Sequence, residues 1–244
     1  SLKSDLKDLG VNKPWWILLG ASVMVLVFNS LRDGAAVFYF KYYVEGADLW
    51  SFSIMDASLT LITIYLVLGQ AFNIVGILCV PALTRAIGKK LTFLSAMAVA
   101  TVLSIIFYFL PKDMVVAILS MQILISFCAG IVSPLMWSMY ADIADYSEWK
   151  TGRRATGLIF SSSSMSQKLG WTIGGSLSGW LLFYFGFEAN VVQTETALTG
   201  ICLMMSVLPA CATLFSVLFI SGYPLNEKKI SEITKELEVR RKEV

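Results

Sequence analysis

Six long apolar runs, separated by short polar stretches, constrain this chain more than any other feature of its sequence. Each run has about the 20 residues that a helix needs to cross the hydrocarbon of a bilayer. Strands of a membrane barrel would be about half as long and would alternate in polarity. The pattern therefore predicts an all-α membrane protein with six transmembrane helices, at roughly 14–40, 58–83, 91–110, 114–140, 155–186 and 197–223.

The composition agrees with lipid as the main solvent. Of the 244 residues, 57% are hydrophobic and only 15% are charged, whereas a soluble domain has about a quarter charged residues. A net charge of +2, with the basic residues spread along the membrane edges, argues against a nucleic-acid partner. The sequence has no histidine, no Walker loop and no nucleophile–base pair, so we expect neither an enzyme nor a metal site.

Prolines help to place the ends of the expected helices. Pro14 follows Asn12 at a helix start, and Pro81 is expected to close the second span. Pro134 and Pro209 fall inside spans and should kink them.

The basic residues predict an orientation. Most lysines and arginines fall on one side of the six spans, whereas the opposite side has only Arg32, Lys41 and Lys112. By the positive-inside rule, both termini are then cytoplasmic and the protein lies in the inner membrane. We expect residues 1–225 to form the bundle and residues 226–244 to form a solvated, amphipathic cytoplasmic tail.

One lysine, Lys168, lies near the middle of the fifth apolar run. An ammonium group is costly in hydrocarbon and is retained where it faces water, a partner or a substrate. In a helix, Ser164 and Trp171 share its face. A cation, a hydroxyl and an aromatic ring predict a surface for a sugar or a carboxylated solute. An internal ion pair of Lys168 is the structural alternative.

The same run repeats small residues at helical spacing, in rows that predict close packing against another helix. One row consists of Gly170, Gly174 and Ser178, and a second of Gly175 and Gly179.

A charge-dense segment precedes this run. Asp142, Asp145 and Glu148 repeat every three residues, and Arg153 and Arg154 follow closely. One interpretation is a solvated loop whose ion pairs contribute little. The functional interpretation is a cytoplasmic gate in which charge pairs hold the inner mouth of a transporter shut.

Acidic residues are expected only at or beyond the ends of the spans, Asp33 among them. Sodium needs oxygen ligands, and proton coupling without histidine needs a buried acid. A coupling-ion site is therefore expected outside this chain.

Two segments, YADIADYSEWKTGRRATG at 140–157 and SQKLGWTIGG at 166–175, resemble the glycoside–pentoside–hexuronide:cation symporters. This melibiose-permease-like branch belongs to the major facilitator superfamily. The chain is similar, over essentially its whole length, to the carboxyl-terminal half, helices seven to twelve. KYYVEGADL at 41–49 and LTRAIGKK at 83–90 also fit.

The resemblance implies roles for several residues. Lys168 falls on the position of a lysine that faces the central cavity, and Gln167, Trp171 and Trp137 are candidate sugar contacts beside it. The acids of the 142–148 segment and Arg154 would belong to a cytoplasmic charge network. The coupling Na⁺ or H⁺ would bind in an amino-terminal half that this chain lacks.

The expected function is cation-coupled symport of a glycoside, pentoside or hexuronide by half of a twelve-helix transporter. Two alternatives remain open. The same fold could move a non-sugar solute, or the chain could be a standalone six-helix scaffold or receptor.

Overall fold

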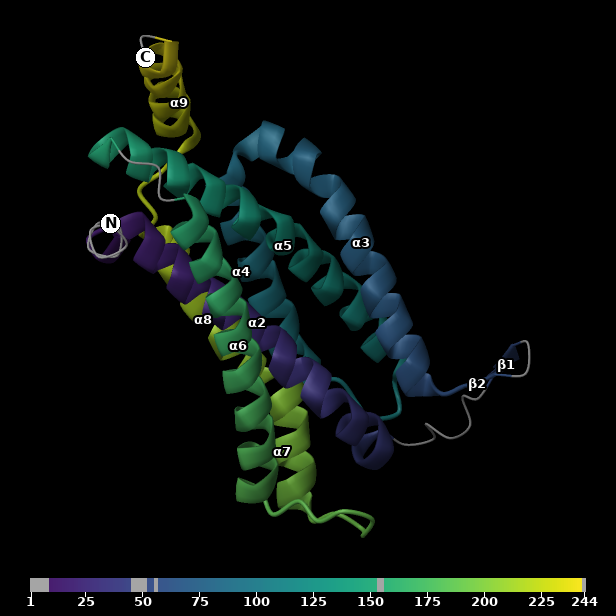
Figure 1. The fold of residues 1–244 in the computed structure, drawn as a ribbon. Coiled ribbons are helices and arrows are strands. Elements are labelled where there is room, and N and C mark those ends of the chain that lie inside the picture. Colours follow the sequence, from purple (N-terminus) through teal and green to yellow (C-terminus); the bar gives the residue numbers. More distant parts are fainter. Residues whose placement is uncertain (1–8, 45–51, 55–56, 153–155, 243–244) are drawn as a thin grey trace.

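The computed structural model describes residues 9–44, 52–54, 57–152 and 156–242. Within these residues the chain is almost entirely helical. The amino- and carboxyl-terminal parts lie at one end of the bundle, and a small hairpin projects from the opposite end (Figure 1). The helices are α2 (Lys13–Phe38), continued by the π-helix η1 (Tyr39–Tyr43), α3 (Leu61–Ile87), α4 (Lys89–Tyr108), α5 (Val115–Thr151), α6 (Thr156–Tyr184), α7 (Glu195–Met205), α8 (Val207–Ser221) and α9 (Glu227–Lys242). Strands β1 (Phe52–Ile54) and β2 (Ala57–Leu59) pair antiparallel.

Five helical segments of the described chain are long and apolar enough to cross a membrane, which confirms an all-α membrane fold. They are Lys13–Tyr43, Leu61–Ile87, Lys89–Tyr108, Val115–Thr151 and Glu195–Ser221. The 29-residue helix α6 has sufficient length, but its serines and Lys168 make it less apolar than the other five. The sixth span therefore stays a prediction.

The start of α2 follows the sequence closely. Asn12 caps the helix, its side chain accepting a hydrogen bond of 3.2 Å from the backbone N–H of Trp15, and Pro14 lies in the first turn. Proline is tolerated there because the first N–H groups of a helix have no intrahelical partner.

Two predicted helix ends are wrong. Pro81 lies inside α3, and the helix ends only before Gly88, whose φ of 81° favours glycine. One missing backbone hydrogen bond at Pro81 is thus tolerated. The 142–148 segment is likewise no loop, because α5 continues to Thr151 and is closed by Gly152 in the left-handed conformation. At 37 residues, α5 is about 55 Å long and exceeds the hydrocarbon thickness of about 30 Å.

Helices α2 and α6 lie side by side along a seam of small residues. A Cβ atom added to Gly170 would collide with Leu26, one added to Gly174 would lie 2.5 Å from Cβ of Ser30, and one added to Gly34 would lie 3.0 Å from Oγ of Ser178. The numbers in the three pairs differ by the same 144 (170 and 26, 174 and 30, 178 and 34). The two helices are therefore parallel and in constant register.

The first small-residue row is thus confirmed as a packing surface, and the second is not. A Cβ added to Gly179 would have nothing within 4 Å, and one added to Gly175 would only just reach Ser30.

We expect Gly174→Ala to destabilise the seam, because the added methyl group has to displace the backbone of α2 or α6. The free energy of unfolding should fall by about 1–3 kcal/mol, the usual cost of overpacking. Gly179→Ala is the matched control and should stay within about 0.5 kcal/mol of the parent. Denaturant unfolding of the complete protein in detergent measures both, and equal stability of the two variants would contradict the seam.

The last apolar segment is interrupted between α7 and α8 at Ser206, whose φ and ψ are −129° and −89°. Pro209 follows three residues later, and its missing N–H leaves the carbonyl of Met205 without a helical partner. Arg32 of α2 supplies that partner, since its Nη1 donates to this carbonyl at 2.5 Å.

The guanidinium of Arg32 holds three other helices to α2. Its Nη2 donates to the hydroxyl of Tyr65 on α3 at 3.0 Å and to Oε1 of Gln122 on α5 at 2.9 Å. Arg32 is 5% exposed, so it lies inside the bundle rather than in a polar connection between spans, and the side of the membrane to which it was assigned stays a prediction. The helix continues through η1 to Tyr43, which places Arg32 inside the span.

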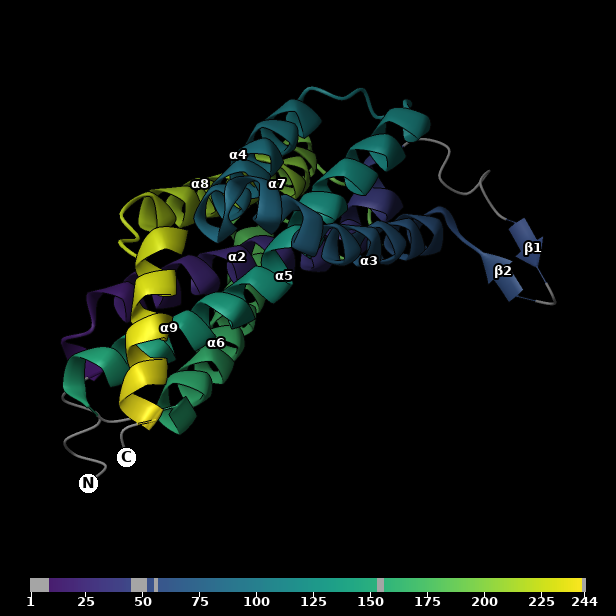
Figure 2. The same cartoon turned by 90° about the horizontal axis from the view of Figure 1, so that it is seen from above.

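Helix α9 crosses the carboxyl-terminal end of α5 (Figure 2). Asn226 caps it by accepting a hydrogen bond of 2.9 Å from the N–H of Lys229. Ile233 and Leu237 are buried in the same hydrophobic cluster as the end of α5. The tail is therefore docked on the bundle rather than solvated on all sides.

Candidate functional site

Ion pairs collect at the end of the bundle that carries the carboxyl-terminal turns of α5, which we call the charged end. Lys89, the first residue of α4, donates from Nζ to both carboxylate oxygens of Asp142, at 2.8 and 2.7 Å. The backbone N–H of Lys89 also donates to Oε1 of Glu227 at 2.8 Å. This one lysine therefore connects α4, α5 and α9.

The other two acids of the segment contact the tail helix. Arg241 of α9 lies 2.5 Å from a carboxylate oxygen of Glu148 and 3.6 Å from one of Asp145. The hydrogen bonds that Arg241 donates to Glu148 raise the pKa of Arg241 further above its ordinary value. Trp149 adds a 2.7 Å hydrogen bond from its Nε1 to Glu236.

The predicted gate acids thus lie on one flank of a helix, where the spacing placed them. The expected cationic partners, Arg153 and Arg154, lie outside the described residues. The cations that the structure does show opposite the acids, Lys89 and Arg241, were not predicted. The basic turn at 83–90 was the available signal for Lys89, and no signal pointed to Arg241.

We expect Lys89→Glu to lower the stability of the charged end, because it places a second negative charge next to Asp142. The side chain of Asp142 is only 13% exposed, so the loss of stability should be about 2 kcal/mol, below the 3–5 kcal/mol of a fully buried pair. Combining Lys89→Glu with Asp142→Lys should recover most of the loss. Unfolding midpoints of the two single variants and the double variant test the pair, and no recovery would contradict it.

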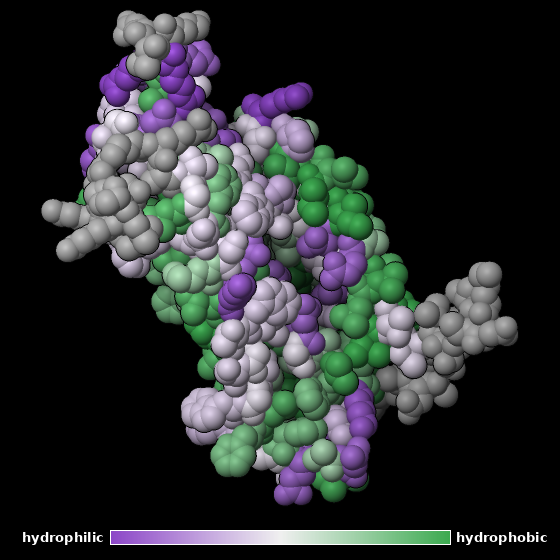
Figure 3. All heavy atoms as spheres, in the orientation of Figure 1, coloured by the Kyte–Doolittle hydropathy of each residue, from purple (hydrophilic) through white to green (hydrophobic). Residues whose placement is uncertain are grey.

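The predicted solute-contacting residues lie on the exposed side of α6, which we call its open face, and on the neighbouring part of α5. Ser164, Lys168 and Trp171 are exposed, and Gln167 is half-buried. Trp137 of α5 is 41% exposed and stacks on Phe160 of α6, with ring centroids 6.2 Å apart. In Figure 3 hydrophilic and weakly polar residues gather over α6, whereas the side formed by α3 is strongly hydrophobic.

Two serines of α6 form hydrogen bonds with side chains of other helices. Ser162 accepts a hydrogen bond of 2.6 Å from Nε1 of Trp15, and Ser166 lies 3.5 Å from the hydroxyl of Tyr140. Ser164 donates weakly, at 3.4 Å, to the carbonyl of Phe160 in its own helix. Its hydroxyl oxygen stays available as an acceptor.

Lys168 has no hydrogen bond or ion pair with any other residue that the structure describes. The internal ion pair that was the structural alternative is therefore not formed within the described parts of this chain. The role of Lys168 in a solute site stays a prediction.

Sequence reasoning missed an acidic residue. Asp33 was expected at a span end, but it lies ten residues before the end of the helical segment Lys13–Tyr43. It is exposed on the bundle surface, next to the buried Arg32.

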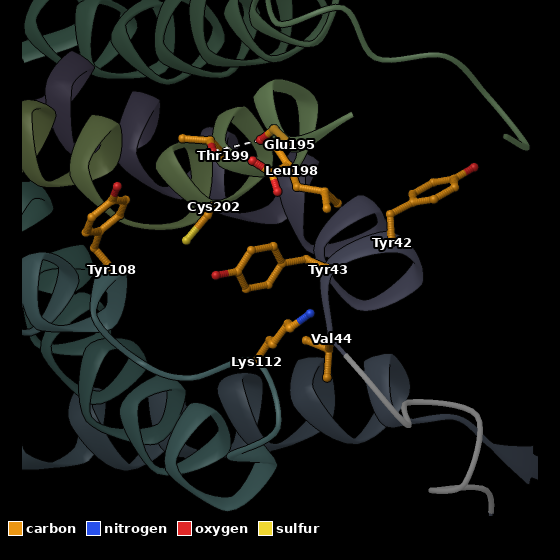
Figure 4. A pocket seen from close by; sticks show the side chains of 9 residues that line it. All are labelled: Tyr42, Tyr43, Val44, Tyr108, Lys112, Glu195, Leu198, Thr199 and Cys202. Atoms are coloured by element: carbon orange, nitrogen blue, oxygen red, sulfur yellow. Dashed lines mark hydrogen bonds between the residues drawn. The ribbon is translucent and has the colours of Figure 1, made fainter. Parts of the chain in front are cut away.

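A separate cavity of about 460 Å³ opens at the other end of the bundle, between η1, the end of α4 and α7. Figure 4 shows the ring of Tyr43 pointing into it, between Cys202 and Lys112, while Tyr42 points away. None of the predicted solute-contacting or gate residues lines this cavity.

A family model described as MFS/sugar transport protein matches residues 1–227. The chain is 31% identical over 99% of its length to a glucuronide carrier protein homolog of Escherichia coli K12, covering 50% of that protein. It is 33% identical over 82% of its length to an isoprimeverose transporter of Lactiplantibacillus pentosus, covering 39%. An inner membrane symporter of Escherichia coli K12 is 28% identical over 91% of the chain, covering 46%. The chain thus spans half or less of each of these relatives.

Proposed function

This chain belongs to the MFS/sugar transport protein family, and we propose that it forms the carboxyl-terminal half of a cation-coupled sugar symporter. In this proposal α6 is the sixth span, both termini are cytoplasmic, and the complete transporter has twelve helices. The two halves move a glycoside, pentoside or hexuronide by alternating access.

The observation that carries the proposal is the unpaired Lys168 on the open face of α6. Its ammonium can donate three hydrogen bonds, so it suits sugar hydroxyls or the carboxylate of a uronide. The neighbouring Trp171 is 47% exposed and offers an apolar ring face for a sugar. The missing half would cover this surface and exclude lipid from it.

The charged end supplies the other part of the mechanism. Asp142 and Glu148 each pair within this half, with Lys89 and Arg241 respectively. We propose that Arg153 and Arg154 complete this network on the cytoplasmic side, and that the network holds the inner mouth shut until the halves rock. The coupling Na⁺ or H⁺ would bind in the amino-terminal half.

Uptake of labelled sugars into vesicles that contain the complete protein tests the proposal. Accumulation driven by an imposed sodium or proton gradient would support symport. If well-inserted protein took up no sugar under either gradient, the sugar assignment would be withdrawn in favour of a non-sugar solute. A complete protein with only these six helices would instead indicate a scaffold or receptor.

A further inference from the structure

The cavity between η1, α4 and α7 lies at the boundary of three membrane segments. Two of the helical segments long enough to cross a membrane, Lys13–Tyr43 and Lys89–Tyr108, end at its wall, and a third, Glu195–Ser221, begins there. The 20 residues of Lys89–Tyr108 give a helix of about 30 Å, which just covers the hydrocarbon of a bilayer. The cavity therefore lies at the depth of the lipid headgroups.

A packed aromatic wall forms one side of this cavity. The ring of Tyr43 points into it (Figure 4) and stacks on the buried ring of Tyr39, with centroids 5.0 Å apart. Lys41 donates to Oδ1 of Asn190 at 2.9 Å, and the N–H of Asn190 donates to the hydroxyl of Tyr42 at 3.0 Å. These bonds tie η1 to the loop before α7. This side of the cavity is thus formed by packing within the chain, and π-helices such as η1 are frequent at functional sites.

Two opposite charges border the same cavity. Lys112, in the loop after α4, and Glu195, the first residue of α7, both line it, and in Figure 4 the ring of Tyr43 lies between them. The backbone carbonyl of Glu195 accepts a hydrogen bond of 2.8 Å from Thr199, but its carboxylate has no partner within the described chain. An ammonium group can donate to phosphate oxygens, and a carboxylate can accept from a primary amine. The pair therefore suits a zwitterion.

An exposed apolar row leads away from the cavity along α4. Tyr108 lines the cavity, and Ile105 and Val102 follow at intervals of three residues, so that each is a surface neighbour of the next. Ile105 is 44% exposed and Val102 is 55% exposed. Polar groups at headgroup depth, with apolar side chains below them, match the shape of an amphiphile rather than that of a small soluble ion.

We propose that this cavity binds the headgroup of a glycerophospholipid that carries both a phosphate and a primary amine. Lys112 donates to the phosphate, Glu195 accepts from the amine, and an acyl chain lies along Ile105 and Val102. A lipid rather than a free aminophosphate is the occupant, because the cavity lies at headgroup depth and adjoins the apolar row. None of the predicted solute-contacting residues lines the cavity, so the lipid site is independent of which solute is transported.

Native mass spectrometry of the delipidated complete protein tests this site, because it resolves individual lipid-bound states. One probe is dioleoylphosphatidylethanolamine, and a second is dioleoylphosphatidylglycerol, which has the phosphate but no amine. We expect Glu195→Gln to raise the dissociation constant of the first about tenfold, as for a lost charged hydrogen bond. The same variant should leave phosphatidylglycerol within about twofold of the parent, whereas Lys112→Gln should weaken both lipids.

Asp113→Asn is the matched control, because it removes an acid at the same end of the bundle that does not line the cavity. It should change the binding of neither lipid. The site would be overturned if Glu195→Gln bound phosphatidylethanolamine normally, lost both lipids equally, or lost no more than Asp113→Asn. Soluble glycerophosphoethanolamine, as a third probe, should bind much more weakly than the lipid. Equally tight binding would overturn the lipid assignment in favour of a free aminophosphate.

Discussion

Lys168→Ala is expected to reduce sugar uptake strongly while the complete protein still inserts in the membrane. The substitution removes the cation that lies on the open face of α6 without a partner in the described chain. A hydrogen bond to a charged group contributes about 1.5–3 kcal/mol, so solute affinity should fall about tenfold to 100-fold. Initial rates of labelled-sugar uptake into vesicles measure the loss, and quantitative membrane yield shows insertion.

Lys168→Arg is the matched control, because it keeps the charge and changes only the shape of the donor group. It should retain part of the uptake. Normal uptake by Lys168→Ala would remove this residue from the solute site. Poor insertion of that variant together with normal insertion of Lys168→Arg would indicate that the charge is needed for assembly with the other half instead.

Arg32→Met should strongly destabilise the bundle. Methionine fills much of the volume but leaves the Met205 carbonyl, the Tyr65 hydroxyl and the Gln122 amide oxygen without their common donor. Unsatisfied buried polar groups cost about 1–3 kcal/mol each, although the groups can partly rearrange. We therefore expect a loss of about 3 kcal/mol in the free energy of unfolding.

Arg32→Lys tests the geometry separately from the charge. A lysine has a compact ammonium group and cannot reproduce the planar fork that reaches three acceptors on three helices. The stability of the Arg32→Lys variant should lie between that of the parent and that of Arg32→Met. If the methionine variant unfolded at the same denaturant concentration as the parent, the three hydrogen bonds would contribute nothing measurable.

Local features of this fold could be predicted from the sequence because they depend on neighbouring residues. Five of the six apolar runs form helices long and apolar enough to span a membrane, and the helix start at Asn12 and Pro14 matches the structure. The prediction that the Gly170 row packs against another helix was also correct, since small residues on one helical face allow close helix packing. The family followed from two short segments, which the match over residues 1–227 confirms.

Features that depend on contacts between distant helices could not be predicted. Asp142 pairs with Lys89, 53 positions earlier in the chain, and packing rather than spacing decides that pair. Arg32 and Asp33 were placed at the membrane edge because charged residues were expected only there, although the expected span ran to residue 40. The π-helix extends that segment to Tyr43, and the break at Ser206 provides the acceptor for Arg32.

The seam between α2 and α6 has a mechanical consequence. Because the glycine and serine contacts leave little room for sliding, we expect the two helices to move as one rigid body. Spin labels on α2 and α6 would then report the same interspin distance in the inward-open and outward-open states. In the proposed twelve-helix transporter, a label pair that joins either helix to the other half would report a change.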